Sequence, residues 1–192
     1  FDKKNSISKV ELMDWLESKK INYSKFCEKI DPKLWSEAQT QANKINFYAR
    51  EKLKDIKYDL GGSAAVDFLY FCVRFLKPET VVETGVAAGY SSMAILQALN
   101  QNNFGHLYSS DFPYFRISNP KKFIGILVPD KMKDRWSLHI DGDKKNIKKI
   151  KEKIKKIELF HYDSDKSYTS RKTTIKNLNS NFYDKTWIIM DD

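Results

Sequence analysis

Beyond residue 62 the chain alternates between two hydrophobic patterns. Short apolar runs of strand length are separated by segments in which apolar residues recur every three or four positions, as on one face of a helix. Strands are predicted at residues 80–83, 106–110, 136–140, 158–163 and 186–190. Helical patterns lie between them, at residues 91–99, 121–133, 144–156 and 168–178. This alternation predicts an α/β fold with a parallel sheet and right-handed crossovers.

The first 60 residues show helical spacing without a strand pattern. Asp31 has the residue type of an N-cap, and Pro32 suits the first position of a helix. Gly61, Gly62 and Ser63 then interrupt the helical spacing. Helices are predicted over residues 8–20, 31–53 and 64–76.

These patterns divide the chain into two predicted parts. Residues 1–60 form a helical extension or lid, which we expect to lie over the carboxyl ends of the strands. Residues 61–192 form a doubly wound, Rossmann-like domain with strand order 3-2-1-4-5. At 192 residues the chain is long enough for one well-buried core with a small helical addition.

The most informative segment is the junction at residues 81–92, with the sequence Val-Val-Glu-Thr-Gly-Val-Ala-Ala-Gly-Tyr-Ser-Ser. An apolar run ends in an acid, turns through small residues and restarts as a helix, so that the helix N-terminus can face an anionic group. The spacing differs from a dinucleotide fingerprint, because Gly85 and Gly89 are its only glycines and Glu83 precedes both. An acid in that place suits a ligand that also carries positive charge. The alternative is a structural turn in another α/β protein.

Glu83-Thr84-Gly85 followed by Gly89-Tyr90-Ser91-Ser92 resembles the first motif of class I S-adenosylmethionine (SAM)-dependent methyltransferases. The likeness is to the catechol O-methyltransferase-like and macrocin O-methyltransferase-like branches. It implies that the methionine part of SAM contacts Glu83 and the loop, and that its carboxylate lies near Tyr90 and Ser91. The resemblance implies SAM contacts for the following residues: Ser63, Glu83, Gly85, Gly89, Tyr90, Ser91, Asp111, Asp143 and Asp163.

Acids also end the next two predicted strands. Asp111 follows the second strand, where an acid can accept hydrogen bonds from both ribose hydroxyls; the alternative is a turn aspartate before Pro113. Asp143 lies in Asp141-Gly142-Asp143, which resembles the family's segment beside adenine.

Carboxylates at the ends of the fourth and fifth strands predict a second cluster. Side-by-side carboxylates are costly unless a hard cation or hydrogen-bond donors offset their charge. The resemblance implies a divalent cation such as Mg²⁺ on Asp163, Asp191 and Asp192; helix capping and solvated turns are the alternative. Asp163 and Lys166 are the candidate catalytic residues, with Lys166 as base. The macrocin-like branch usually reads Asp-Ser-Asp-His-Ser-Tyr here, so this chain has Lys in place of His, and a surface lysine remains an alternative.

The three histidines do not have the spacing of a helical metal motif. His106 and His139 are interpreted as strand residues without a function. His161 is two residues before Asp163 and shares a strand face with it. We expect a core histidine with satisfied hydrogen bonds there, with support of the acidic cluster as the alternative.

Composition is typical of a folded enzyme domain, with 41% hydrophobic and 14% aromatic residues. Cys27 and Cys72 lack a metal or redox spacing and are expected to be reduced and packed. No apolar run has the length of a membrane span, and we expect a cytoplasmic protein, with a homodimer left open.

The net charge of +9 is concentrated in the lysine- and isoleucine-rich helix at residues 144–156, where lysines on the outer face would be solvated.

Together these features predict a SAM-dependent methyltransferase that acts on the oxygen of a small hydroxylated acceptor. The sequence lacks the Asn/Asp-Pro-Pro-Tyr/Phe motif of nucleic-acid amino methyltransferases. The alternatives are an RNA methyltransferase and a non-catalytic SAM-binding or scaffold protein with a basic surface. The resemblance also implies antiparallel strands after the fifth strand, and no sequence follows Asp191-Asp192 to form them, so we expect the domain to be incomplete at its C-terminus.

Overall fold

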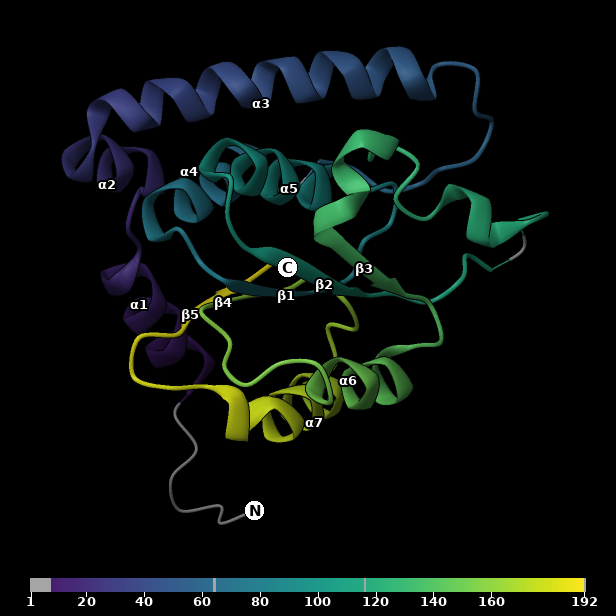
Figure 1. The fold of residues 1–192 in the computed structure, drawn as a ribbon. Coiled ribbons are helices and arrows are strands. Elements are labelled where there is room, and N and C mark those ends of the chain that lie inside the picture. The colour runs from purple at the N-terminus through teal and green to yellow at the C-terminus, as the bar shows by residue number, and fades with distance from the viewer. Residues whose placement is uncertain (1–7, 64, 116, 192) are drawn as a thin grey trace.

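The computed structural model describes residues 8–63, 65–115 and 117–191, and within them a five-stranded parallel sheet forms the centre (Figure 1). The strand order β3-β2-β1-β4-β5 confirms the predicted order 3-2-1-4-5. Parallel pairing places all the carboxyl ends at one edge of the sheet. The strands are β1 (Thr80–Thr84), β2 (His106–Ser110), β3 (Trp136–His139), β4 (Leu159–Tyr162) and β5 (Trp187–Met190).

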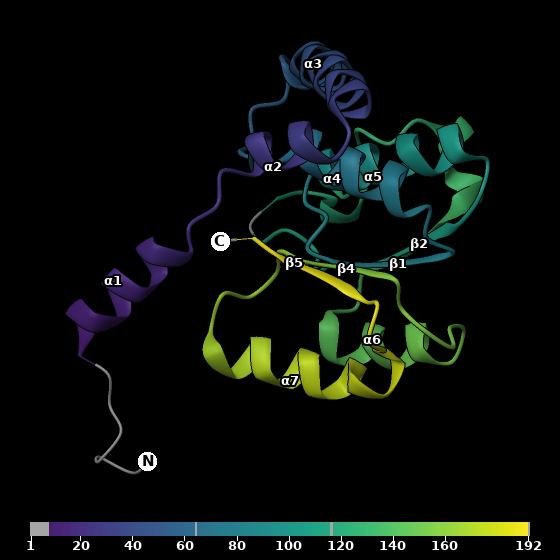
Figure 2. The ribbon, with the colours of Figure 1, turned by 90° about the vertical axis from the view of Figure 1, so that its left-hand side faces the viewer.

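Helices cover both faces of the sheet (Figure 2). On one face lie α4 (Val66–Leu76) and α5 (Tyr90–Asn102), which pack against each other. On the other face lie α6 (Asp143–Lys151) and α7 (Tyr168–Leu178). In α6, Ile147 and Ile150 are buried while most of the lysines are exposed, which confirms the predicted solvated face.

Two of the three N-terminal helices, α2 and α3, form an additional layer rather than a cover over the strand ends, and α1 lies apart from that layer (Figure 2). The three helices are α1 (Lys9–Lys19), α2 (Tyr23–Ile30) and α3 (Pro32–Leu53). Asp31 caps α3 as predicted, because its Oδ1 accepts a hydrogen bond from the Leu34 amide at 2.9 Å. The expected position over the carboxyl ends is wrong for α3: its buried stripe, which includes Trp35 and Ile45, packs against α4 and α5 (Figure 2).

The segment after α3 does reach the carboxyl edge of the sheet. The Leu60 carbonyl accepts hydrogen bonds from the Ala88 amide at 3.3 Å and from the Tyr114 hydroxyl at 2.9 Å. The connection to α4 therefore contacts the loop after β1.

Some element boundaries differ from the expected ones. The helical pattern at residues 121–133 forms two short 3₁₀ helices, η2 (Pro120–Phe123) and η3 (Asp130–Arg135), because Pro129 lies within the predicted range and interrupts a continuous helix. Helix α6 ends at Lys151, before the predicted residue 156. Cys27 and Cys72 are buried free thiols, as predicted. Among the helices of the described residues, none combines the length and hydropathy that crossing a bilayer requires.

Candidate active site

The loop between β1 and α5 lies at the centre of the carboxyl edge and depends on glycine. Gly85 has a φ of +85°, and a Cβ placed on it would lie 2.3 Å from the Asp163 carbonyl oxygen. Gly89, with a φ of +98°, is the N-cap of α5 and offers no side-chain hydrogen bond to the first turn. The amides at the start of α5 are thus not capped by that residue's side chain, which is the arrangement that binds anionic groups.

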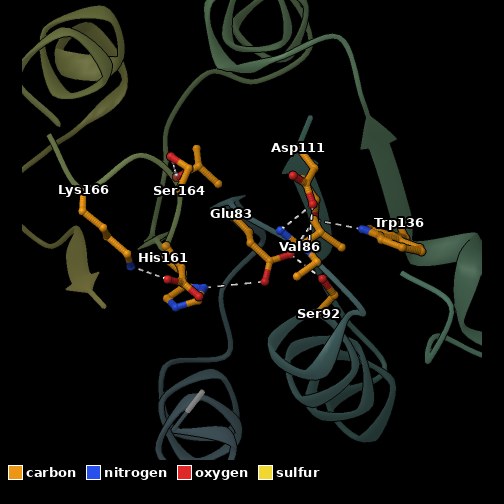
Figure 3. A network of polar contacts seen from close by, with 12 residues as sticks. Glu83, Val86, Ser92, Asp111, Trp136, His161, Ser164 and Lys166 are labelled. Carbon is orange, nitrogen blue, oxygen red and sulfur yellow. Dashed lines mark hydrogen bonds and ion pairs between the residues drawn. The ribbon is translucent and has the colours of Figure 1, made fainter. Parts of the chain in front are cut away.

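Glu83 lies beneath this loop and is fully buried. Its Oε2 accepts hydrogen bonds from the hydroxyls of Ser92, at 2.6 Å, and Ser109, at 2.8 Å. Ser109 in turn accepts one from the Trp136 indole at 2.8 Å (Figure 3). The Oε1 atom has no hydrogen-bond partner among the described residues and lies 3.6 Å from His161 Nδ1. Half of this buried carboxylate is therefore held by hydroxyls, and half faces β4.

Asp111, predicted as the ribose ligand, supports the loop directly. Its Oδ2 accepts hydrogen bonds from the amides of Val86, at 3.0 Å, and Ala87, at 2.7 Å (Figure 3). Its Oδ1 accepts one from the Phe112 amide at 2.6 Å. Burial raises the pKa of Asp111 and the charge of Glu83 acts in the same direction, whereas the three amide donors oppose the rise. The carboxylate joins the end of β2 to the loop after β1.

A cleft of about 540 Å³ opens beside Asp111, between the strand ends and helices α6 and α7. Asp143, the first residue of α6, lines it together with Asp111, Phe112 and Ser164. The Asp143 carboxylate accepts hydrogen bonds from Ser110 Oγ at 2.5 Å and Ser164 Oγ at 2.7 Å. The two acids that sequence analysis assigned to the ribose and adenine of the cofactor thus line one cleft.

The remaining predicted cofactor residues lie around the same loop. Tyr90 and Ser91 begin α5, where Tyr90 is half-buried and Ser91 is buried. Ser63 is exposed in the connection that precedes α4. That connection approaches the loop at Gly61, where an added Cβ would lie 3.5 Å from the Ala87 Cβ.

A second group forms where β4 and β5 end. His161, Asp163 and Asp191 offer ligand atoms that all lie within 4.8 Å of one another. Lys166, which is labelled in Figure 3, contacts Asp163 Oδ1 through its Nζ. It also donates a hydrogen bond to the Asp191 carbonyl oxygen at 2.6 Å. The predicted proximity of Asp163 and Asp191 agrees with this arrangement, while Asp192 lies outside the described residues.

His161 differs from the expected core histidine. It is fully buried, as predicted, but neither ring nitrogen has a hydrogen-bond partner in the described part of the chain. The 3.6 Å separation from Glu83 is too long for a hydrogen bond. The donor set fits a cation chemically, because carboxylate and imidazole atoms converge and the buried imidazole lacks another partner.

Several residues of the network escaped sequence analysis. Ser109 contacts Glu83 because the register of β1 and β2 pairs these two positions, which no local pattern reveals. Asn146 is buried in α6 and donates hydrogen bonds to Ser110 Oγ and to the carbonyls of Asp111 and His139. These hydrogen bonds connect α6 to the ends of β2 and β3. The only sequence signal for them was a lone asparagine among lysines and isoleucines.

Solved structures share this fold. An O-methyltransferase from Bacillus cereus in complex with SAH aligns with 15% identity and a TM-score of 0.60, covering 77% of this chain and 65% of that chain. The O-methyltransferase TomG from Streptomyces achromogenes is involved in tomaymycin synthesis and was solved with SAM. It aligns with 14% identity and a TM-score of 0.61, covering 77% of this chain and 64% of that chain. An SAH-bound methyltransferase from Podospora anserina aligns with 18% identity and a TM-score of 0.52, covering 97% of this chain and 73% of that chain.

This chain therefore spans slightly less than two thirds of the length of the first two structures. At these identities the likeness concerns the fold. No curated protein sequence gives a significant match. A family model described as a methyltransferase domain matches residues 82–192, from β1 to the end of the chain. Because the match covers more than half of its residues, the chain belongs to this methyltransferase domain family.

Proposed function

We propose that this chain is a SAM-dependent methyltransferase that transfers the methyl group to the oxygen of a small hydroxylated acceptor. The observation that carries the proposal is the glycine loop after β1, whose amides are held by Asp111, a residue that lines the cleft together with Asp143. Membership of the methyltransferase family supports it, as do the SAM- and SAH-bound O-methyltransferases of the same fold.

In the proposed complex the methionine part of SAM lies at the loop, near Gly85, Gly89, Tyr90 and Ser91. Glu83 lies directly below and provides negative charge beneath the positively charged end of the cofactor. Ser63, in the connection that approaches the loop at Gly61, and Asp163, whose carbonyl lies against Gly85, complete this part of the site.

The adenosine part is assigned to the cleft. Asp111 and Asp143 line it, and Asp111 accepts the ribose hydroxyls in addition to holding the loop amides. Both acids are already positioned by hydrogen bonds, which reduces the ordering that cofactor binding requires.

The transfer breaks the bond between the methyl carbon and the sulfonium sulfur and forms a bond to the acceptor oxygen. In this proposal Lys166, at the ends of β4 and β5, first releases a proton from its ammonium to solvent, and its neutral Nζ then takes the hydroxyl proton of the acceptor. Asp163 and Asp191, with Asp192 as a further proposed ligand, would hold a divalent cation. When bound, such a cation supplies positive charge that lowers the pKa of the acceptor hydroxyl.

Calorimetry with SAM and with NAD tests the cofactor assignment. We expect SAM to bind and NAD to bind much more weakly, because the loop lacks the dinucleotide spacing. Turnover is then measured on a panel of small hydroxylated compounds and on RNA. Preference for NAD would contradict the proposal, and stoichiometric SAM binding without turnover on either panel would favour a non-catalytic SAM-binding protein. The homodimer and the cytoplasmic location stay predictions from sequence.

A further inference from the structure

The cluster at the ends of β4 and β5 contains a buried side chain that nothing in the described structure satisfies. The ring of His161 is 1% exposed, yet both of its nitrogens lack hydrogen-bond partners among the described residues. Burying polar atoms without partners is unfavourable, so a histidine in this state points to a ligand that completes it. Its neighbours decide what that ligand is.

The surroundings of His161 are anionic on two sides. Nδ1 faces Glu83 Oε1, which is itself without a hydrogen-bond partner in the described residues, at 3.6 Å. A ring nitrogen also lies within 4.8 Å of carboxylate oxygens of Asp163 and Asp191. Figure 3 shows His161 between Glu83 and Lys166. Two carboxylates and an imidazole that converge in this way offer the ligand atoms that a cation requires.

We propose that His161 is itself a metal ligand, and that with Asp163 and Asp191 it forms a mixed nitrogen and oxygen site that prefers Mn²⁺ or another first-row transition-metal ion to Mg²⁺. This inference rests on the proposed methyltransferase site and adds a ligand to it. Imidazole nitrogen favours transition-metal ions, whereas Mg²⁺ is bound mainly by oxygen.

Glu83 then has a second purpose. A metal-bound histidine usually donates its other ring N–H to a carboxylate, which fixes the tautomer and the ring orientation. With Nδ1 facing Glu83 Oε1, Nε2 is the nitrogen that binds the ion. Glu83 Oε2 is already held by Ser92 and Ser109, so the carboxylate is fixed in place to orient the imidazole. An ion on Nε2 gives that atom its partner, and a small shortening of the 3.6 Å separation would pair the other two partnerless atoms, Nδ1 and Glu83 Oε1.

Lys166 is the group that the ion displaces. Its Nζ contacts Asp163 Oδ1, and its side chain is 41% exposed, so the ammonium can leave without disturbing the core. The ion replaces one positive charge on Asp163 by another and leaves Lys166 free to face the acceptor.

Pulsed electron paramagnetic resonance of Mn²⁺ added to the full chain tests the proposal directly. We expect nitrogen hyperfine coupling from a coordinated imidazole in the unaltered chain. The coupling disappears in His161→Asn and is kept in the matched control His106→Asn, whose histidine contacts Ser137 on the sheet. Mn²⁺ bound without nitrogen coupling would overturn the assignment of His161, even with the cation on the two aspartates.

Equilibrium dialysis with Mn²⁺ and Mg²⁺ measures the selectivity. His161→Asn lowers Mn²⁺ affinity about 10- to 100-fold, the range seen when groups around a metal are removed. It changes Mg²⁺ affinity less, because asparagine still offers an oxygen. Equal affinity of the unaltered chain for both ions, or equal losses in the variant, would contradict the proposed preference.

Calorimetry with SAM separates the failure of this inference from the failure of the proposed function. A chain that binds SAM but no Mn²⁺ overturns the metal site and leaves the methyltransferase proposal standing. A chain that binds Mn²⁺ with nitrogen coupling but does not bind SAM overturns the methyltransferase proposal and leaves the metal site standing. SAM affinity of His161→Asn reports whether that variant folds, and the nitrogen signal of the unaltered chain needs no variant.

Discussion

At the carboxyl ends of β1 and β2 and at the start of α6, hydrogen-bond donors hold the carboxylates, whereas at the ends of β4 and β5 the Asp163 carboxylate contacts Lys166. Glu83, Asp111 and Asp143 accept hydrogen bonds from serine hydroxyls and loop amides on all but one of their oxygens. Asp163 contacts Lys166, and neighbouring His161 has no hydrogen-bond partner among the described residues.

This difference between the two groups of carboxylates agrees with the two kinds of ligand that we propose for them. Donors that fix carboxylates before any ligand arrives form a rigid surface for a large organic cofactor, at low cost in ordering. Carboxylates and an imidazole with few donors suit a small cation, which satisfies them all at once. In our proposal the ends of β1 and β2, with Asp111 and Asp143, are the cofactor half and are preformed. The ends of β4 and β5, with Asp163 and Asp191, are the acceptor half and are completed by the ligands that bind there.

Gly85→Ala should have the largest effect, because Gly85 is where the two halves touch. The added Cβ would lie 2.3 Å from the Asp163 carbonyl oxygen, on a backbone with a φ of +85°. We expect a loss of about 3 kcal/mol or more in the free energy of unfolding and the loss of SAM binding. Urea unfolding and calorimetry measure both.

The matched control for this substitution is Gly62→Ala, where an added Cβ meets nothing within 4 Å. It should leave stability and SAM affinity close to those of the unaltered chain. Equal effects of the two substitutions would show that the contact between the halves is not specific.

Lys166→Met tests the acceptor half alone. Loss of a general base should lower turnover about 100-fold or more, while SAM affinity stays unchanged. Because the ammonium no longer competes for Asp163, Mn²⁺ should bind more tightly. The control is Lys176→Met, an exposed lysine on α7. Turnover retained in Lys166→Met would remove this lysine from the mechanism.

Asp111→Ala tests the cofactor half. It removes the acceptor of the Val86 and Ala87 amides together with the proposed ribose contact. SAM affinity should fall by roughly 1 to 3 kcal/mol, with Mn²⁺ binding unchanged. Calorimetry with SAM and, separately, with Mn²⁺ measures these two affinities. Unchanged SAM affinity would refute the assignment of Asp111.

The smallest expected effect is a pH dependence of stability from Asp111. Burial raises the pKa of this carboxyl in the folded chain above its ordinary value of 3.8. The folded state therefore holds the proton more tightly, and this group's contribution to stability falls as pH rises from about that value through the raised pKa. Relative to Asp111→Asn, the free energy of unfolding of the unaltered chain should decline over this window. A difference that is flat with pH would contradict the raised pKa.

The order of the elements and the position of the loop could be predicted from local sequence. Alternating apolar runs and helical spacing are periodic features, and periodicity reports which side of an element is buried. Gly85 and Gly89 stand out because an L-side chain at positive φ is strained, so the constraint is visible in single residues. The shorter α6 and the two 3₁₀ helices were missed, since element ends depend on competing local contacts.

What the sequence determined by itself is therefore the parallel sheet, its order and the acids at the strand ends. Only the tertiary structure decided how those acids are used. The register of β1 with β2 and β4 places Glu83 between Ser109 and His161, residues distant along the chain. The buried face of α3 packs against α4 and α5 rather than over the strand ends. Hydrogen bonds, burial and cation sites depend on such long-range neighbours, and no local pattern encodes them.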